Sequence, residues 1–201
     1  MGSDGERRCW WPGEHEDYRR YHDAEWGRPT IDQHRLFEKI CLEGFQSGLS
    51  WLTILRKREN FRTAFVDFDI ERVATFGEAD VERLLGDAGI IRHRGKIEAT
   101  INNAQRAIEL IDAEGDLVDW LWSWAVEEPV RTEDGGVPAT TDRSIALAKD
   151  LKRRGWRFFG PTTAYAFMQS EGLTNDHLDG CFVRPDCERE RTAFLRDRSL
   201  R

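Results

Sequence analysis

The sequence predicts an all-α fold, and three observations support this prediction. Apolar residues recur at the spacing of one face of a helix through most of the chain. Period-two alternation of apolar and polar residues, which a half-buried strand requires, is nearly absent over more than four residues. Glycine, proline and N-capping residues divide the apolar segments into lengths typical of helices. We therefore expect one helical domain over residues 1–183 and a loosely held polar tail over residues 184–201.

The first half of the chain predicts a run of helices after an irregular start. Residues 1–30 are rich in aromatic, charged and turn residues, which indicates short helical turns and loops. Asp32 is suited to cap a helix that carries apolar residues at 36, 37, 40 and 41 and ends near Leu49. The helical patterns that follow cover residues 51–65, 69–75, 78–87 and 96–113.

The second half continues with three further helical patterns. Residues 116–126 carry apolar residues at helical spacing, and residues 127–139 contain the prolines and glycines of a loop. Thr141 or Asp142 is suited to cap a helix that ends near Arg154. A glycine-bounded turn over residues 155–161 leads into a last helix over residues 162–170.

Composition limits the classes of function. A formal net charge of -7 argues against a protein that coats nucleic acid indiscriminately, although basic clusters near residues 56–58, 92–96 and 152–157 leave room for a local basic face. No apolar run is long enough to span a bilayer, and the polar first eight residues do not resemble a signal peptide. We therefore expect a cytoplasmic protein whose four cysteines are thiols or metal ligands.

The stretch from Cys41 to Trp51 places one carboxylate, that of Glu43, on a strongly apolar background. An unpaired carboxylate beside the apolar stripe of a helix would be costly. Two interpretations are open: a surface salt bridge, which this segment alone favours, and a buried carboxylate that binds a ligand.

The turn over residues 155–161 resembles the helix-hairpin-helix motif that binds the DNA backbone. Backbone N–H groups near Gly160 and Thr162, at the start of the following helix, could hold a phosphate with help from the helix dipole and from Arg157. An ordinary helix-helix turn is the alternative. Residues 89–95 form a similar turn with more charge.

Histidines and cysteines indicate a metal site. Cys9 and His22 form one widely spaced pair, and His177 and Cys181 form a second pair separated by three residues. Two thiolates and two imidazoles complete a closed tetrahedral zinc site, which would join the N- and C-terminal segments. The alternative is two unrelated pairs. The other members of these residue types are expected at the surface (His15, His34, His93), in the core (Cys41) or in an incidental position (Cys187).

Several short segments occur in a specific order along the chain. They are Cys9, Tyr18, Tyr21-His22-Asp23, Glu25-Trp26-Gly27, Leu42-Glu43-Gly44, Gly48-Leu49-Ser50-Trp51, Lys57-Arg58-Glu59-Asn60, residues 87–97 and Asn175-Asp176-His177. Each is weak alone, but their order and spacing together resemble the 3-methyladenine DNA glycosylase I family. The resemblance runs from about Arg8 to Cys181, nearly the whole chain.

The resemblance implies a helix-hairpin-helix glycosylase fold with one structural zinc ion, and an enzyme that removes 3-methyladenine from alkylated double-stranded DNA. It also implies a pocket for the flipped base, with Glu43 and Tyr21 as the candidate catalytic residues. The base-binding residues that it implies are Tyr18, Tyr21, Glu43, Trp51, Trp11 and Trp26. Trp10 stands where the family pattern has a small residue, so the shape of the aromatic pocket wall near it differs from the family pattern.

The chemistry of the lesion agrees with these residue types. Methylation at N3 makes the base cationic, and a cation between aromatic faces gains roughly 0.5–2 kcal/mol over a neutral base. A carboxylate favours the cation further. Because the cationic base leaves as a neutral molecule, strong acid catalysis is unnecessary. Related glycosylases place an aspartate after the hairpin, where this chain has Asn175, with Asp176 as the fallback candidate. Leu49 is either a wedge that fills the gap left in the duplex or an ordinary core leucine.

Two rival interpretations belong to other classes of function. One is a DNA-binding or damage-sensing module that kept the fold and lost turnover, and the other is a hydrolase whose zinc activates water. Intact Glu43 and aromatic positions argue against the first. Four protein ligands, which leave no open coordination position, argue against the second. A monomer suits an enzyme that engages duplex DNA with one face.

Overall fold

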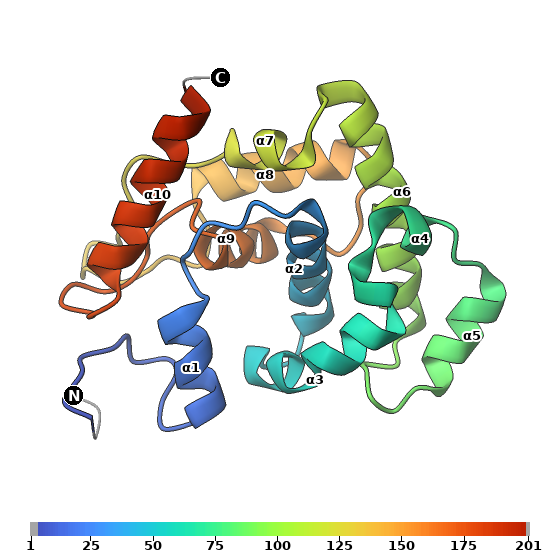
Figure 1. Cartoon of the computed structure of the whole chain (residues 1–201), viewed down its shortest axis with the longest axis horizontal. Helices are drawn as coiled ribbons and strands as arrows, with labels where there is room; N and C mark the ends of the chain where they lie inside the picture. Colours follow the sequence, from blue (N-terminus) through green and yellow to red (C-terminus); the bar gives the residue numbers. More distant parts are fainter. Residues whose placement is uncertain (1–3, 200–201) are drawn as a thin grey trace. The chain divides into compact units, whose positions relative to one another are not determined.

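The structure, a computed structural model, describes residues 4–199, and within that range the chain forms helices and no strand (Figure 1). The predicted all-α fold is confirmed. None of the helices in residues 4–199 is long and apolar enough to cross a membrane. In chain order the elements are α1 (Glu16–Ala24), α2 (Gln33–Gln46), α3 (Trp51–Ala64), the 3-10 turn η1 (Val66–Phe68), α4 (Ile70–Ala74), α5 (Glu78–Gly86), α6 (Arg94–Glu114), α7 (Leu117–Trp122), α8 (Asp142–Arg153), α9 (Pro161–Ser170) and α10 (Arg184–Ser199).

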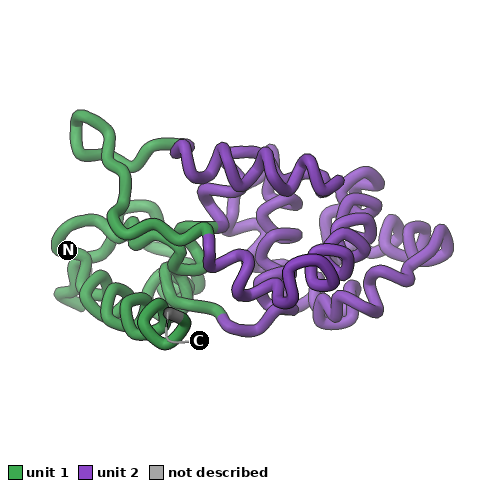
Figure 2. The backbone as a smooth tube through the Cα atoms, turned by 90° about the horizontal axis from the view of Figure 1, so that it is seen from above, with its two compact units in different colours: residues 1–30, 124–139, 168–201 green, residues 31–123, 140–167 purple. Residues whose placement is uncertain are grey.

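The chain divides into two compact units, each built from segments that are distant in sequence (Figure 2). The unit that holds both chain ends, called the terminal unit below, comprises Met1–Thr30, Trp124–Ala139 and Met168–Arg201. The other, called the central unit, comprises Ile31–Ser123 and Thr140–Phe167. The N- and C-terminal segments therefore pack in one unit, and the single domain over residues 1–183 stays a prediction.

Helix α2 belongs to the core of the central unit, where it packs against α3, α6 and α7. Its start is fixed by Asp32, whose carboxylate accepts from the backbone N–H groups of His34 and Arg35. Its end is held by Lys96 of α6, whose Nζ donates to the carbonyl oxygens of Phe45 and Ser47 at 2.9 and 2.7 Å. These contacts hold both ends of the helix that carries Glu43.

A group of phenylalanine rings fills the core around α2 and α3. The ring centroids of Phe45 and Phe61 lie 4.6 Å apart, and those of Phe65 and Phe68 lie 5.4 Å apart. All four side chains are fully buried. Burial of rings of this size accounts for a large part of the hydrophobic stabilisation of a domain.

The C-terminal segment differs from the loosely held tail that its charge suggested. Residues 184–199 form α10, and the buried Arg191 donates from Nε to the carbonyl oxygen of Gly172 at 3.0 Å. The amide of Asn175 donates to the carbonyl oxygen of Arg184 and to Glu188, at 3.1 and 3.0 Å. Hydrogen bonds to other segments of the terminal unit therefore hold a helix that lacks an apolar stripe.

Candidate functional site

Four side chains converge in the terminal unit, and we call them the metal-ligand cluster: Cys9, His22, His177 and Cys181. All four are buried, and one potential ligand atom from each lies within 4.8 Å of the others. His22 Nε2 is 3.6 Å from Cys181 Sγ, and His177 Nδ1 is 3.6 Å from Cys9 Sγ and 3.5 Å from Cys181 Sγ. The structure thus brings together the two pairs that the sequence left open as unrelated.

These distances fit a tetrahedral metal site. With Zn–S of about 2.3 Å and Zn–N of about 2.0–2.1 Å, tetrahedral sulfur and nitrogen ligands lie about 3.6 Å apart. Each imidazole also uses its other nitrogen: His22 Nδ1 is 2.8 Å from Asp23 Oδ1, and His177 Nε2 is 3.0 Å from the carbonyl oxygen of Trp26. Both outer nitrogens are therefore N–H donors, which directs a lone pair of each ring into the cluster. The cluster could hold one metal ion.

A chain of hydrogen bonds behind His22 supports its orientation. The guanidinium of Arg8 donates to both carboxylate oxygens of Asp23, at 2.8–3.0 Å, and to Asp4. Outer partners of this kind fix the ring and raise its basicity as a ligand. Asp23 was quoted as part of a family segment, but its place behind a ligand depended on the fold.

The two cysteines differ in their affinity for a proton. The pKa of Cys181 is lowered well below its ordinary value, mainly because the thiol of Cys9 donates a hydrogen bond to its sulfur, with further support from His177 and His22. The pKa of Cys9 is raised by that same hydrogen bond and by burial. A metal ion replaces the shared proton when it binds two thiolates.

Cys187 is not incidental, which corrects the expectation from sequence. Its Sγ is buried and lies 3.5 Å from His177 Nε2, on the side of the ring away from Nδ1. Gly27 packs against the same ring edge, where an added Cβ would meet Nε2 at 2.9 Å. These two residues leave His177 little room to turn. The signal missed in the sequence was the position of Cys187 in a helix rather than in a loose tail.

Four of the five aromatic residues expected at the base pocket, Trp11, Tyr18, Tyr21 and Trp26, lie together in the terminal unit, and the fifth, Trp51, belongs to the central unit. The ring centroid of Trp11 is 4.8 Å from that of Tyr18, 6.3 Å from that of Tyr21 and 5.2 Å from that of Trp26. Trp26 also packs edge-on against His177 at 4.6 Å. The metal-ligand cluster and these four aromatic residues therefore form one continuous packed group, in which the ligands fix the segment that carries the tyrosines.

A second polar cluster lies in the central unit, and we call it the Glu43 cluster: Lys39, Glu43 and Trp51. Glu43 is only 5% exposed, and Lys39 Nζ lies 3.0 Å from its Oε1. The same Nζ lies 3.3 Å from the ring centroid of Trp51. Glu43 does form a salt bridge, but the pair is buried, which contradicts its expected place at the surface. That the buried carboxylate binds a ligand stays a prediction. Lys39 was missed in the sequence, although its position four residues before Glu43 places it on the same face of the helix.

The turn between α8 and α9 is held by two asparagines of α6. Asn103 exchanges two hydrogen bonds of 2.9 Å with the backbone of Arg157, and Asn102 donates to the carbonyl oxygen of Gly155 at 2.9 Å. Phe158 has a φ of +54°, which is uncommon for a residue with a side chain. The side chains of Arg157 and Thr162, together with Gly160, are exposed as a phosphate-binding turn requires.

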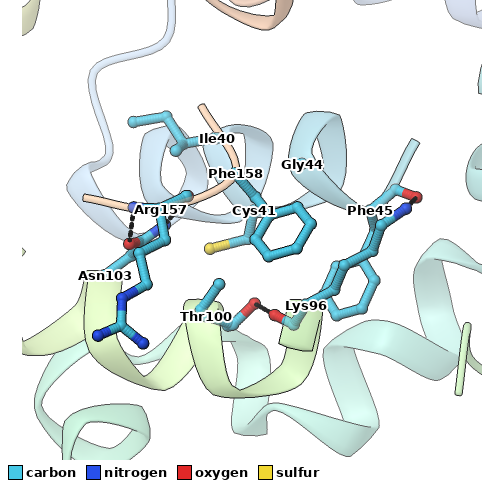
Figure 3. A pocket seen from close by; sticks show the side chains of 10 residues that line it. Ile40, Cys41, Gly44, Phe45, Lys96, Thr100, Asn103, Arg157 and Phe158 are labelled. Atoms are coloured by element: carbon cyan, nitrogen blue, oxygen red, sulfur yellow. Dashed lines mark hydrogen bonds between the residues drawn. The ribbon is translucent and has the colours of Figure 1, made fainter. Parts of the chain in front are cut away.

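A narrow cleft, partly open to solvent, lies beside this turn (Figure 3). Residues of α2, α6 and the turn line it, among them Cys41, Thr100 and Phe158. Burial raises the pKa of the Cys41 thiol, as expected for a core cysteine. The α2 residues that line the cleft lie on the opposite side of that helix from Lys39 and Glu43. The cleft is therefore separate from the Glu43 cluster.

The structure also shows the surroundings of three further candidate residues, Asp176, Asn175 and Leu49. Asp176 is buried, forms an ion pair with Arg131 and accepts from Gln169 at 3.0 Å, so structural contacts engage its carboxylate. The amide nitrogen of Asn175 is bound to α10 as described above. Leu49 is 42% exposed, which excludes the core interpretation of that leucine.

Comparisons with known proteins agree with this arrangement. A family model described as methyladenine glycosylase matches residues 11–184. The chain is 49% identical to DNA-3-methyladenine glycosylase 1 of Escherichia coli (strain K12), over 89% of this chain and 97% of the relative. A crystal structure of 3-methyladenine DNA glycosylase I superposes with a TM-score of 0.82 at 49% identity, over 88% of this chain and 98% of that chain.

A second solved structure gives the same result at lower identity. It is that of 3-methyladenine DNA glycosylase I from Staphylococcus aureus, described as showing the structural basis of 3-methyladenine recognition. Its TM-score is 0.82 at 37% identity, over 89% of this chain and 96% of that chain. The match to the family model covers most of the sequence and includes the whole Glu43 cluster and three of the four metal-ligand residues, His22, His177 and Cys181. The chain belongs to the methyladenine glycosylase family.

Proposed function

We propose that this protein is a base-excision repair glycosylase that flips 3-methyladenine out of alkylated DNA and removes it by hydrolysis. The observation that carries the proposal is the buried carboxylate of Glu43, whose partner Lys39 also lies over the face of Trp51, in a chain of this family. The relatives named above as 3-methyladenine glycosylases support the identity of the base. The protein acts in the cytoplasm as a monomer on double-stranded DNA.

The reaction follows from the charge of the lesion. A base inside the stack is out of reach, so the nucleotide rotates into a pocket at a cost of a few kcal/mol. The methylated base carries a positive charge, which Glu43 neutralises and the face of Trp51 attracts. The N9–C1′ bond breaks with its electron pair moving to the base, which leaves neutral. Water adds to C1′ and loses a proton to solvent.

The aromatic residues of the terminal unit complete the recognition in this proposal. Tyr18 and Tyr21 contact the flipped base, and Trp11 and Trp26 form further aromatic walls. Tyr21 is buried and packs edge-on against Trp11, which limits its rotation. A rigid aromatic surface binds a planar cation with little loss of side-chain entropy. An undamaged adenine lacks the charge that these groups and Glu43 select.

The turn between α8 and α9 serves as the helix-hairpin-helix contact with the DNA backbone. Gly160 supports this role because a Cβ there would meet no heavy atom within 4 Å, so packing does not require a glycine. Close approach of a phosphate to the backbone does favour one. Thr162 and Arg157 add donors at the start of α9. The exposed Leu49 is suited to fill the gap left by the flipped nucleotide.

The metal in this proposal is one structural zinc ion, held by Cys9, His22, His177 and Cys181. Four protein ligands provide folding free energy and leave no position for a catalytic water. Cys9 and His22 come from the N-terminal segment, and the other two come from the segment before α10. The ion thereby joins the two segments and holds the aromatic residues between Trp11 and Trp26 in place.

Release of free base from methylated duplex DNA tests this function. The protein is incubated with DNA treated with a methylating agent, and the soluble products are separated by chromatography. We expect 3-methyladenine as the main released base. A protein that binds the DNA but releases no base is the damage-sensing module described above, and that result contradicts the proposal.

A further inference from the structure

Lys39 contacts Glu43 and Trp51, the two residues that the proposed function assigns to the charged base. Its ammonium group lies 3.0 Å from Glu43 Oε1 and 3.3 Å from the ring centroid of Trp51. Lys39, like its two partners, is less than 10% exposed. A positive charge thus lies between a carboxylate and an indole face within the central unit.

The proposed substrate offers a positive charge to the same two groups. A methylated adenine needs the Glu43 carboxylate as its counter-charge and the Trp51 face for its cationic ring. In the structure the ammonium of Lys39 already balances the charge of Glu43. The buried carboxylate therefore has a counter-charge, without which its burial would be costly. Another cation can take the place of this counter-charge.

Glu38, one turn away on the same helix, shows how a permanently committed carboxylate differs. It is buried like Glu43, but its oxygens accept from Arg35 and from Arg62, the latter through Nε to both oxygens at 3.0 and 3.1 Å. Guanidinium groups of two arginines hold a carboxylate in a fixed geometry, whereas one lysine supplies a point charge on a flexible stem. The pairing of Glu43 is therefore the exchangeable one.

We propose, building on the proposed function, that Lys39 is a resident cation that the charged lesion displaces from Glu43. When the glycosidic bond breaks, the base becomes neutral and no longer balances the carboxylate. The ammonium of Lys39 then returns to Glu43 and expels the product. Lys39 thus disfavours the binding of neutral bases, which cannot replace its charge at Glu43. It also accelerates product release.

The test compares product affinity with turnover in Lys39→Met, which keeps the length of the side chain and removes its charge. Neutral 3-methyladenine is the probe, measured by calorimetry and as an inhibitor of excision from methylated duplex DNA. We expect it to bind about tenfold more tightly to Lys39→Met than to the unsubstituted protein. Multiple-turnover kcat should fall relative to the single-turnover rate because product release is slower.

Three further variants keep the result interpretable. Lys39→Arg retains a cation and should bind the product within about threefold of the unsubstituted protein. Lys149→Met removes one charge from the exposed face of α8 and should change nothing. Lys39→Gln repeats the measurement in case the methionine variant does not fold, as judged by thermal unfolding.

Product affinity within twofold of the unsubstituted protein in both Lys39→Met and Lys39→Gln overturns the inference. That result is distinct from failure of the proposed function, in which the unsubstituted protein neither binds 3-methyladenine nor releases it from DNA. A double variant adds a check, since in Glu43→Gln the exchange of Lys39 for methionine should no longer tighten product binding.

Discussion

The metal-ligand cluster and the Glu43 cluster are both buried and polar, but they satisfy their groups in different ways. In the former, four ligand atoms converge within 4.8 Å, and the outer nitrogens of both imidazoles are fixed by Asp23 and by the carbonyl oxygen of Trp26. In the latter, one carboxylate faces one ammonium group beside an indole ring. The first arrangement suits a permanent ion, and the second suits exchange of one cation for another.

This difference separates stability from activity. In the proposed function, loss of a metal ligand would leave buried thiols and imidazoles without the ion that joins two chain segments. Loss of Glu43 would leave the fold and the metal in place and would remove the counter-charge of the base. We therefore expect substitutions in one cluster to change unfolding and metal content, and substitutions in the other to change excision.

The largest effect is expected for Cys9→Ser. The free energy of unfolding should fall by more than about 3 kcal/mol, part of the about 10–16 kcal/mol that structural zinc contributes in small domains. Urea unfolding and elemental analysis of metal per chain measure both quantities. Cys41→Ala, which removes a buried thiol outside the cluster, should keep its metal. A Cys9→Ser protein that retains one metal ion per chain would contradict the assignment of Cys9 as a metal ligand, and with it the difference between the two clusters.

Asp23→Asn should act on the metal without removing a ligand. The amide weakens the hydrogen bond to His22 Nδ1, and outer partners of this type contribute 10–100-fold to metal affinity. Competition with a chromogenic chelator gives the affinity. Glu16→Gln, an exposed change on the same helix, serves as the control and should leave the affinity unaltered.

Trp51→Leu should affect excision without affecting the metal, because Trp51 belongs to the Glu43 cluster. It removes the ring that lies under Lys39 and, in the proposed function, under the base, so excision should fall about tenfold while metal content is unchanged. The matched control is Trp120→Leu, whose ring centroid lies 5.2 Å from the guanidinium carbon of Arg154. Equal losses in the two variants would show that general tryptophan packing, rather than the Glu43 cluster, governs the rate.

The smallest effect is expected outside both clusters, for Arg157→Ala. Asn103 holds the backbone of residue 157, so the turn should persist without the arginine side chain. We expect duplex affinity to fall about three- to fivefold and the slope of log affinity against log salt to decrease by about 1. Arg189→Ala on α10 is the control, and an equal change there would remove the assignment of the α8–α9 turn as a backbone contact.

Local sequence signals predicted most of the fold. Asp32 and Thr141 were expected as N-caps, and both side chains accept the hydrogen bonds that begin α2 and α8. Apolar spacing located α3 to α7 and α9 to within a few residues, whereas α1 lies in a stretch that was expected to form only short helical turns and loops. These features depend on residues close in sequence, which is why they could be inferred without a structure.

The missing parts depend on tertiary contacts. Helix α10 has charges around its circumference, and Arg191 and Cys187 join it to other segments of the terminal unit. The left-handed φ values of Val66, Asp67 and Phe68 run against the preference of residues with side chains and have no local signal. For the site, residue types indicated the four possible metal ligands, whereas the role of Lys39 required the burial of Glu43 and the position of Trp51.

The most direct test of the central claim is single-turnover excision by Glu43→Gln, with metal content and unfolding measured on the same preparation. The amide keeps a hydrogen-bond acceptor near Lys39 but removes the negative charge that the cationic base needs. We predict a loss of about 100-fold or more in the rate of 3-methyladenine release, with one metal ion per chain retained. Excision at the rate of the unsubstituted protein, or loss of the metal together with activity, would contradict the division between the two clusters.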